Sequence, residues 1–253
     1  MQDSMTARRT VLFDLGGTLI YFDGAWPDVY LRADEALIDA LEGAGIHLNR
    51  QAFREEFRAR LKAYYNERES EFIEYTTSFV LKEALASWGY LGVPEATIRP
   101  ALDAMYRVSQ AHWQVEEDAL PTLAQLIQRG CRLGLISNAG DDADVQSQVD
   151  QARLRPYFEL ILTSASLGIR KPNPRIFQLA MRRIDADPGL TVMVGDTLGA
   201  DILGARNAGI RSIWITRRAD TPANRAHADT ITPDAIAGRL AEVPGIVEAM
   251  LGV

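Results

Sequence analysis

The chain has 253 residues, of which 47% are hydrophobic and 24% charged, and its 27 Lys and Arg against 34 Asp and Glu give a net charge of −7. This composition is that of a globular protein and excludes an intrinsically disordered chain. Binding along a nucleic acid requires a basic stripe, which the sequence lacks, so we expect no nucleic-acid partner.

The sequence predicts a protein that neither enters nor crosses a membrane. No apolar stretch approaches the ~20 residues that a membrane helix requires, and the apolar run after Arg8 and Arg9 is too short for a secretory signal. A single cysteine, Cys131, excludes an intramolecular disulfide and lends no support to an oxidising compartment. We therefore expect a cytoplasmic location and no membrane partner, and the oligomeric state is left open.

The first predicted element is a strand over residues 10–14, a short apolar run that ends at Asp14 and is followed at once by Leu-Gly-Gly. Roughly one hundred residues with helical periodicity and almost no strand signal come next. The amphipathic helices expected there cover residues 28–44, 51–68, 77–88 and 97–113. We expect these helices to form a bundle over residues 21–115. His112 and Trp113 are expected to pack within it, with lining of the cleft as the alternative.

Strands and helices alternate after this insertion. Strands are predicted at residues 131–137, 158–163, 191–196 and 211–216, and helices at 120–129, 174–184 and 201–208, the last ended by Gly209. Such alternation is typical of a parallel sheet with right-handed crossovers. The tail, residues 233–253, is expected to form two short helices interrupted at Pro244-Gly245. We therefore predict a Rossmann-like α/β core domain from residues 1–20 and 116–253, with the helical bundle inserted after its first strand.

Polar residues stand at or after the ends of four predicted strands. In an open parallel sheet this is the edge where ligands bind. The residues are Asp14, Ser137 in LISNAG, Lys171 in RKPNP, and the pair Asp196 and Asp201 in VGDTLGAD. Taken singly, each has an ordinary structural interpretation as a helix cap, a turn hydroxyl or a solvated loop lysine.

Taken together, these residues predict a metal-assisted site for an anion. Crowded carboxylates raise one another's pKa unless a cation is present, and Mg²⁺ takes carboxylate, carbonyl and water oxygens. Lys171 and Ser137 are then available to hold the oxygens of a phosphate. The implied chemistry is phosphoryl transfer to a carboxylate, followed by hydrolysis.

At these residues the sequence resembles the haloacid dehalogenase-like hydrolase superfamily, in particular the members with a helical cap inserted after the first strand. The resemblance implies that Asp14 is the nucleophile and that Ser137 and Lys171 assist catalysis and bind the substrate, a small phosphorylated metabolite. It also implies that Mg²⁺ is held by Asp14, Asp196, Asp201 and the backbone carbonyl of Gly16. We further expect Thr18 and Asn138 to bind the substrate.

One position departs from the family pattern. Phosphatases of this family carry a second Asp two residues after the nucleophile as general acid and base, whereas this chain has Gly16. A positioned general acid contributes roughly 10²- to 10⁴-fold to the rate. Either activity is reduced, or the leaving group needs no proton, as in an acyl phosphate, an anhydride or an aryl phosphate, or another acid such as Asp23 reaches the site.

Other functions stay open at this point. A phosphate- and Mg²⁺-binding protein with little turnover is compatible with the missing acid. Carbon–halogen hydrolysis is a further alternative, although the dehalogenases of the superfamily need no metal and carry an aromatic residue where Gly16 stands. Phosphonate hydrolysis would need a Schiff-base lysine, for which the insertion offers Lys62 and Lys82. Substrate specificity is expected to come from the insertion, with Tyr21, Phe22 and Trp26 as candidates.

Overall fold

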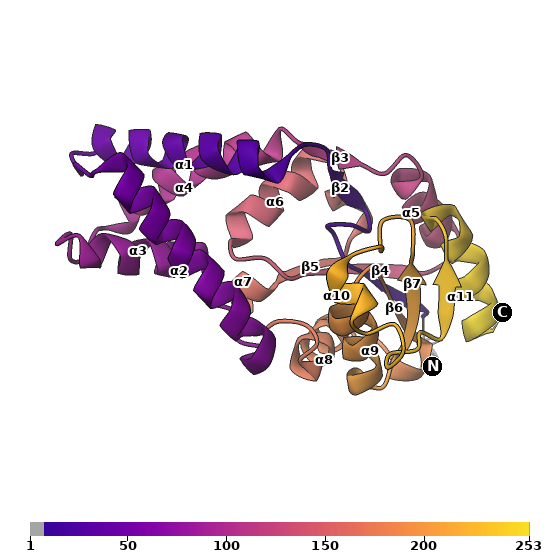
Figure 1. Cartoon of the computed structure of the whole chain (residues 1–253). Coiled ribbons are helices and arrows are strands. Elements are labelled where there is room, and N and C mark those ends of the chain that lie inside the picture. Colours follow the sequence, from indigo (N-terminus) through magenta and orange to yellow (C-terminus); the bar gives the residue numbers. More distant parts are fainter. Residues whose placement is uncertain (1–7, 253) are drawn as a thin grey trace, which may run out of the picture.

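The computed structural model describes residues 8–252 and, within them, every side chain except those of residues 68–71. Residues 1–7, which belong to the predicted core domain, and residue 253 lie outside the described residues. Figure 1 shows a group of long helices at one end of the molecule and a sheet with flanking helices at the other, where both ends of the described chain also lie.

The core of the fold is a six-stranded sheet in the order β5-β4-β1-β6-β7-β8. Every neighbouring pair of strands is parallel. The strands are β1 (Thr10–Phe13), β4 (Arg132–Ser137), β5 (Leu160–Thr163), β6 (Thr191–Gly195), β7 (Arg211–Ile215) and β8 (Ala235–Ala237). The α/β class and the parallel sheet predicted from the sequence are confirmed.

Strand β1 lies in the middle of this sheet, and its side chains alternate between two apolar clusters. Val11 and Phe13 face one side, covered by α5 (Ala119–Gln128), α6 (Asp142–Gln151) and α11 (Val243–Leu251). Leu12 faces the other side, covered by α8 (Pro174–Arg183) and α9 (Leu203–Ala208). Burial on both faces explains why β1 is a continuous apolar run.

Shorter elements complete the core. They are the helices α7 (Ser164–Leu167) and α10 (Pro222–Arg225), the 3-10 turns η1 (Arg155–Tyr157), η2 (Pro188–Leu190) and η4 (Leu240–Glu242), and one π-helical turn, η3 (Leu198–Ile202). One prediction was wrong here, and one helix was missed. The tail forms β8, η4 and a single α-helix, α11, which contains Pro244 and Gly245 in its first turn, and α6 was not predicted.

The segment between β1 and β4 carries four helices around an apolar cluster of their own. These are α1 (Trp26–Gly43), α2 (Arg50–Glu71), α3 (Thr77–Ser87) and α4 (Glu95–Gln110), and Leu37, Phe53 and Leu102 are fully buried among them. The chain leaves the sheet and returns to it through an antiparallel pair, β2 (Ile20–Phe22) and β3 (Trp113–Val115). The predicted helix that ends at residue 113 is therefore too long, because Trp113 belongs to β3.

The helical insertion also touches the sheet at a second place. Backbone hydrogen bonds run from Thr77 N–H to the carbonyl of Gly140, from Glu74 N–H to Gly168, and from Arg170 N–H to Phe72. The insertion is therefore fastened both by the β2/β3 pair and by the segment between α2 and α3.

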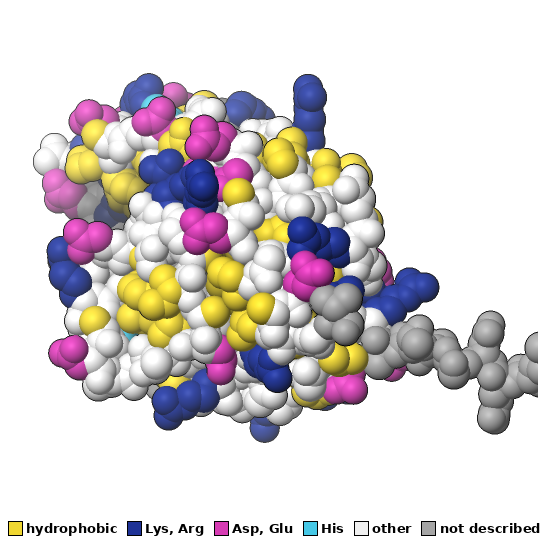
Figure 2. Space-filling model, turned by 90° about the vertical axis from the view of Figure 1, so that its right-hand side faces the viewer, with side chains coloured by type: hydrophobic (Ala, Val, Ile, Leu, Met, Phe, Trp, Pro, Cys, Tyr) yellow, Lys and Arg dark blue, Asp and Glu magenta, His cyan; other side chains and the backbone are white. Residues whose placement is uncertain are grey.

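Two observations concern the surface. Within the described part of the chain, no helix is long and apolar enough to cross a membrane. Figure 2 shows one face of the molecule, on which basic and acidic side chains are interspersed with hydrophobic ones.

Candidate active site

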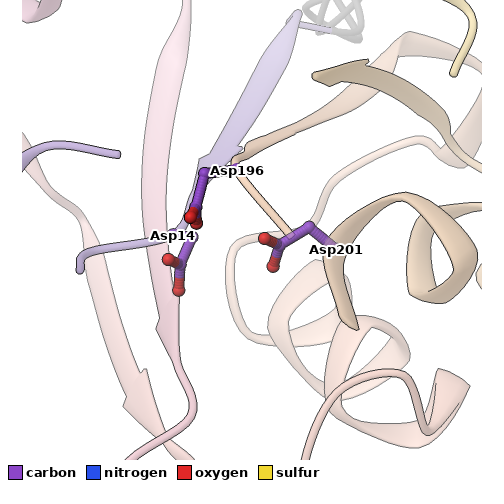
Figure 3. Close-up of side chains that lie close together, drawn as sticks. All are labelled: Asp14, Asp196 and Asp201. Carbon is purple, nitrogen blue, oxygen red and sulfur yellow. The ribbon is translucent and has the colours of Figure 1, made fainter. Parts of the chain in front are cut away.

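Three carboxylates meet at the edge where β1 and β6 end. Asp14 directly follows β1, Asp196 directly follows β6, and Asp201 lies in the π-helical turn after it. One oxygen of each carboxylate lies within 4.8 Å of the others, and all three residues are buried. Figure 3 shows the side chains of Asp14, Asp196 and Asp201 gathered at this edge. Because β1 and β6 are adjacent and parallel, they deliver Asp14 and Asp196 to the same place.

Two glycines allow the carboxylates to come this close. A Cβ atom on Gly17, whose φ is +82°, would lie 2.5 Å from Asp196 Oδ2, and one on Gly195 would lie 2.3 Å from Asp201 Oδ2. Both distances are shorter than any real contact of a Cβ atom. Glycine is therefore required at both positions for the observed placement of Asp196 and Asp201.

Lys171 is buried between two of the carboxylates. Its Nζ atom lies 2.6 Å from Asp14 Oδ1, to which it donates a hydrogen bond, and 2.7 Å from Asp201 Oδ1, and it also donates to the carbonyl of Ile136. The Asn138 side chain donates to the carbonyl of Lys171 and accepts from its backbone N–H. Asn138 therefore fixes the backbone that carries the buried ammonium group.

The electrostatics of the cluster call for a further cation. Burial raises the pKa of Asp14 to about 6, Lys171 lowers it in part, and Asp201 raises it. Burial, followed by repulsion from Asp14 and Asp201, raises the pKa of Asp196 to about 8. Burial lowers the pKa of Lys171, but the adjacent Asp14 and Asp201 carboxylates outweigh it and raise that pKa overall. One ammonium group thus faces three acids, and a divalent cation with hard oxygen ligands fits this donor set.

The other residues singled out in the sequence lie around this cluster. Ser137 ends β4, is buried and lines the cavity described below. The hydroxyl of Thr18 is 3.4 Å from Asp196 Oδ1, and Thr18 is not among the residues that line the cavity. The backbone N–H of Thr197 donates to Asp201 Oδ2 and holds that carboxylate at the start of its turn.

A cavity of about 520 Å³ lies between the carboxylates and the helical insertion. Its sheet side includes Asp14, Ser137, Asn138, Lys171 and Asp201, and its helical side includes Trp26, Tyr30, Arg58, Tyr65, Met105 and Tyr106. The candidate nucleophile therefore faces a space large enough for a small molecule.

Trp113 fills the space beside Gly16. A Cβ atom on Gly16 would lie 3.3 Å from the Cη2 atom of Trp113, and the indole lines the cavity. Sequence reasoning favoured packing of Trp113 within the helical bundle and kept lining of the cleft as the alternative. The alternative holds, because Trp113 lies at the end of the insertion and returns with the chain to the strand ends.

Three residues considered as alternatives lie elsewhere. Asp23, the candidate replacement acid, is exposed and does not line the cavity. Lys62 is exposed on α2, and Lys82 pairs with Glu95 on the surface of the insertion. Neither lysine lines the cavity, so neither stands where a Schiff base would act on a bound substrate.

A family model of haloacid dehalogenase-like hydrolases matches residues 8–209. This chain belongs to that family. The phosphoserine phosphatase of Thermus thermophilus is 34% identical to this hydrolase over 164 residues, which are 65% of this chain and 62% of that protein. The chain thus aligns with less than two thirds of that relative's length.

Solved structures resemble this hydrolase over nearly its whole length. A HAD phosphatase from Thermococcus onnurineus has a TM-score of 0.65 and 24% identity, covering 94% of this chain and 97% of that one. A 2-haloacid dehalogenase from Pseudomonas syringae pv. tomato has a TM-score of 0.65 and 29% identity, covering 96% of this chain and 99% of that one. The position of the helical insertion, directly after the first strand and its motif, is consistent with the subclass expected from the sequence.

Proposed function

We propose that this hydrolase is a Mg²⁺-dependent phosphatase that acts on a small phosphorylated metabolite through an aspartyl-phosphate intermediate on Asp14. The observation that carries the proposal is the buried cluster of three carboxylates, two of which, Asp14 and Asp201, pair with Lys171 and line a cavity. The proposal includes helices α1–α4 as a cap over that cavity and a cytoplasmic location. The phosphoserine phosphatase of Thermus thermophilus supports the phosphatase assignment.

The proposed reaction has two steps. An oxygen of Asp14 attacks the phosphorus, a P–O bond to Asp14 forms, and the bond to the leaving-group oxygen breaks with its electron pair. Water then attacks the same phosphorus, the bond to Asp14 breaks, and both hydrogens of the water leave on inorganic phosphate. Asp14 returns as a carboxylate.

Lys171 and Ser137 hold the reacting groups in this proposal. Lys171 orients the Asp14 carboxylate through its hydrogen bond and compensates negative charge as the phosphoryl group approaches. Ser137 lines the cavity at the end of β4, where its hydroxyl can donate to a phosphoryl oxygen. Asn138 acts through Lys171, whose backbone it fixes on both sides.

Asp14, Asp196 and Asp201 would hold the Mg²⁺ ion, together with the carbonyl of Gly16. When bound, the ion would neutralise the carboxylates and stabilise charge on the phosphoryl oxygens. The raised pKa values of Asp14 and Asp196 support this placement, since burial and mutual repulsion make both acids hard to deprotonate unless a cation is present.

Phosphate release from acetyl phosphate and p-nitrophenyl phosphate, with Mg²⁺ or with EDTA, tests the proposal. Wild type should turn over both substrates only with Mg²⁺. Asp14→Asn should lose at least about a thousandfold in rate, whereas Asp220→Asn, on an exposed surface pair with Arg225, should behave as wild type. Mass spectrometry of acid-quenched enzyme should find the phosphoryl group on Asp14.

Two other outcomes point to different functions. Phosphate binding in calorimetry without turnover of either substrate would support a binding protein, a function favoured by Gly16 and by the Trp113 ring beside it. Turnover of a haloacetate that ignores EDTA would support carbon–halogen hydrolysis, which is favoured by the 29% identity to the Pseudomonas syringae dehalogenase.

A further inference from the structure

Gly16 supplies no acid at the position where the phosphatases of the family carry their second Asp. Trp113 fills the space beside Gly16. Beyond the cluster of three carboxylates, the described acids that line the cavity are Asp141 and Asp144. Asp141 accepts from Arg99 and from the backbone of Asp144, and Asp144 accepts from the side-chain amides of Gln110 and Gln148. Both oxygens of each of these two acids are therefore engaged in holding α4 and α6 together.

Next to this place stands a stack of aromatic rings. Phe22 lies on Trp26 with ring centroids 3.5 Å apart and 8° between the planes, and Trp26 lies on Tyr30 at 5.0 Å. The guanidinium group of Arg58 covers Tyr30 at 4.3 Å, and Trp113 meets Phe22 and Trp26 edge-on. These contacts hold the rings in place. We call Trp26, Tyr30 and Trp113 the aromatic wall.

The wall is open to the cavity. Trp26 and Tyr30 are 37% and 40% exposed, and both line the cavity together with Trp113. Large aromatic rings left exposed beside a reactive cluster provide an apolar contact surface for a ligand, and a second aromatic ring packs favourably edge-to-face against them.

The charges of the cavity indicate a ligand with one phosphate. Arg58 pairs with Asp34, and Arg170 pairs with Glu74, so both arginines that line the cavity already have carboxylate partners. Asp141 and Asp144 also line the cavity, so a second phosphate, as in an anhydride, would bring further negative charge into a cavity that already holds two more acids. An acyl phosphate of a small acid would leave the aromatic wall without contact.

We propose that the substrate is an aryl phosphate, a monoester of a phenol whose ring contacts Trp26, Tyr30 and Trp113. This inference rests on the proposed function and specifies its substrate class. A phenol has a pKa of about 10, far below the ~16 of water. A phenolate therefore departs without the acid that Gly16 cannot supply.

The first step then balances without a proton donor. Asp14 forms a bond to phosphorus, the bond from phosphorus to the phenol oxygen breaks, and the electron pair leaves on the phenolate, which takes a proton from bulk water. The second step has the carboxylate of Asp14 as its leaving group and needs no acid either.

Four substrates separate the ring from the leaving group. Phenyl phosphate has both the ring and a good leaving group, benzyl phosphate has only the ring, acetyl phosphate has only the leaving group, and propyl phosphate has neither. We expect KM to be low for the two substrates with rings. We expect kcat to be at least about 10²-fold higher for phenyl than for benzyl phosphate, the loss that a missing general acid causes.

Substitutions in the aromatic wall test whether the wall causes the lower KM of the substrates with rings. Trp26→Leu and Tyr30→Leu should each raise KM for phenyl and benzyl phosphate about tenfold, and leave KM for acetyl phosphate unchanged. Phe79→Leu is the matched control, because Phe79 is an exposed aromatic residue of the insertion, 47% exposed, that does not line the cavity. In calorimetry, phenylphosphonate should bind more tightly than methylphosphonate, and only in proteins with an intact wall.

The outcomes distinguish this inference from the proposed function. Mg²⁺-dependent turnover of acetyl phosphate, with equal KM values for phenyl and propyl phosphate, would overturn the inference and leave the phosphatase proposal intact. Equal kcat values for phenyl and benzyl phosphate would do the same, since they would require a proton donor. Absence of turnover with all four substrates would overturn the phosphatase proposal itself.

Discussion

The spacing of the buried carboxylates depends on residues that carry no side chain. A single methyl group on Gly17 would overlap the Asp196 carboxylate, and one on Gly195 would overlap the Asp201 carboxylate. The site is thus defined by a backbone that leaves room as much as by the acids themselves.

We expect Gly195→Ala to displace the Asp201 carboxylate, because the added Cβ would lie 2.3 Å from its Oδ2 atom. The affinity for Mg²⁺ should fall by about tenfold or more, as it does when groups that orient metal ligands are altered. Calorimetric titration with Mg²⁺ measures this. Gly43→Ala is the control, since nothing lies within 4 Å of a Cβ atom there, and equal affinities of the two variants would contradict the expectation.

The raised pKa of Asp144 predicts that the stability of the protein depends on pH. Burial raises its pKa to about 6, so the folded state binds this proton more tightly than the unfolded state. The resulting stabilisation is complete below a pH of about 4, and it is lost as the pH rises through about 6. Asp144→Asn removes the titration. The variant should therefore gain stability relative to wild type as the pH rises, by at most about 3 kcal/mol at pH 8.

Urea unfolding at several pH values between about 4 and 8 checks this sign. The exposed Asp220→Asn serves as the control. A stability difference between Asp144→Asn and wild type that stays constant across this range would show that Asp144 is not the group responsible.

The acids and Lys171 were accessible from the sequence because each follows a strand, and parallel strands end at one edge. The contact of Asn138 with the Lys171 backbone and that of Trp113 with Gly16 could not be predicted in this way. Asn138 holds the backbone of Lys171, a residue far away in sequence, and Trp113 reaches Gly16 only because β3 returns beside β2. Such contacts depend on tertiary geometry that no local pattern encodes.

At the scale of elements, helices α8 and α9 pack so closely that one of them needs a glycine. A Cβ on Gly204 would lie 2.5 Å from Phe177 and 3.2 Å from the backbone of Pro172. Phe177 belongs to the apolar cluster that covers the face of the sheet on which Leu12 lies.

Gly204→Ala should destabilise the protein by about 1–3 kcal/mol through overpacking, although alanine favours a helix. Gly245→Ala, in the first turn of α11 with open space around it, should be neutral or stabilise by up to about 1 kcal/mol. Denaturant unfolding measures the change in the free energy of unfolding for each variant. A similar change for the two substitutions would rule out packing as the cause.

Long periodic elements were predicted well and short ones were not. Four of the six sheet strands lie within one residue of their predicted bounds on each side, and the fifth predicted strand, β5, begins two residues late. Strands β2, β3 and β8 have three residues each, too few for a pattern, and α6 buries only Val145, Gln148 and Val149 along a mostly polar sequence. Pro244 suggested a break, but proline is tolerated in the first turn, where it lies in α11.

At the scale of the molecule, one buried acid joins the helical insertion to the sheet. Glu74 accepts from Tyr64 of α2 and from Ser164 of α7, and it pairs with Arg170 beside Lys171. Its side chain is fully buried. The insertion is therefore tied to the loop that carries the ammonium group of the site.

We expect Glu74→Gln to destabilise the protein by about 3 kcal/mol, because it removes the buried negative charge that pairs with Arg170. The exposed pair of Lys82 and Glu95 provides the control, and Glu95→Gln should change stability by less than about 0.5 kcal/mol. Urea unfolding compares them, and cleavage by proteases within residues 72–77 should accelerate only in Glu74→Gln. Equal stabilities would mean that Glu74 does not hold the insertion.

The central position of β1 has a consequence for how the molecule comes apart. Both edges of β1 are paired, with β4 and β6, and its side chains are fully buried, so its amide protons should exchange with solvent only when the whole sheet opens. The candidate nucleophile, Asp14, thus stands at the end of a strand that is paired on both edges and fully buried. On heating, the helical insertion should unfold before β1 does. Ligand binding should then be lost while the sheet that carries Asp14 is still folded.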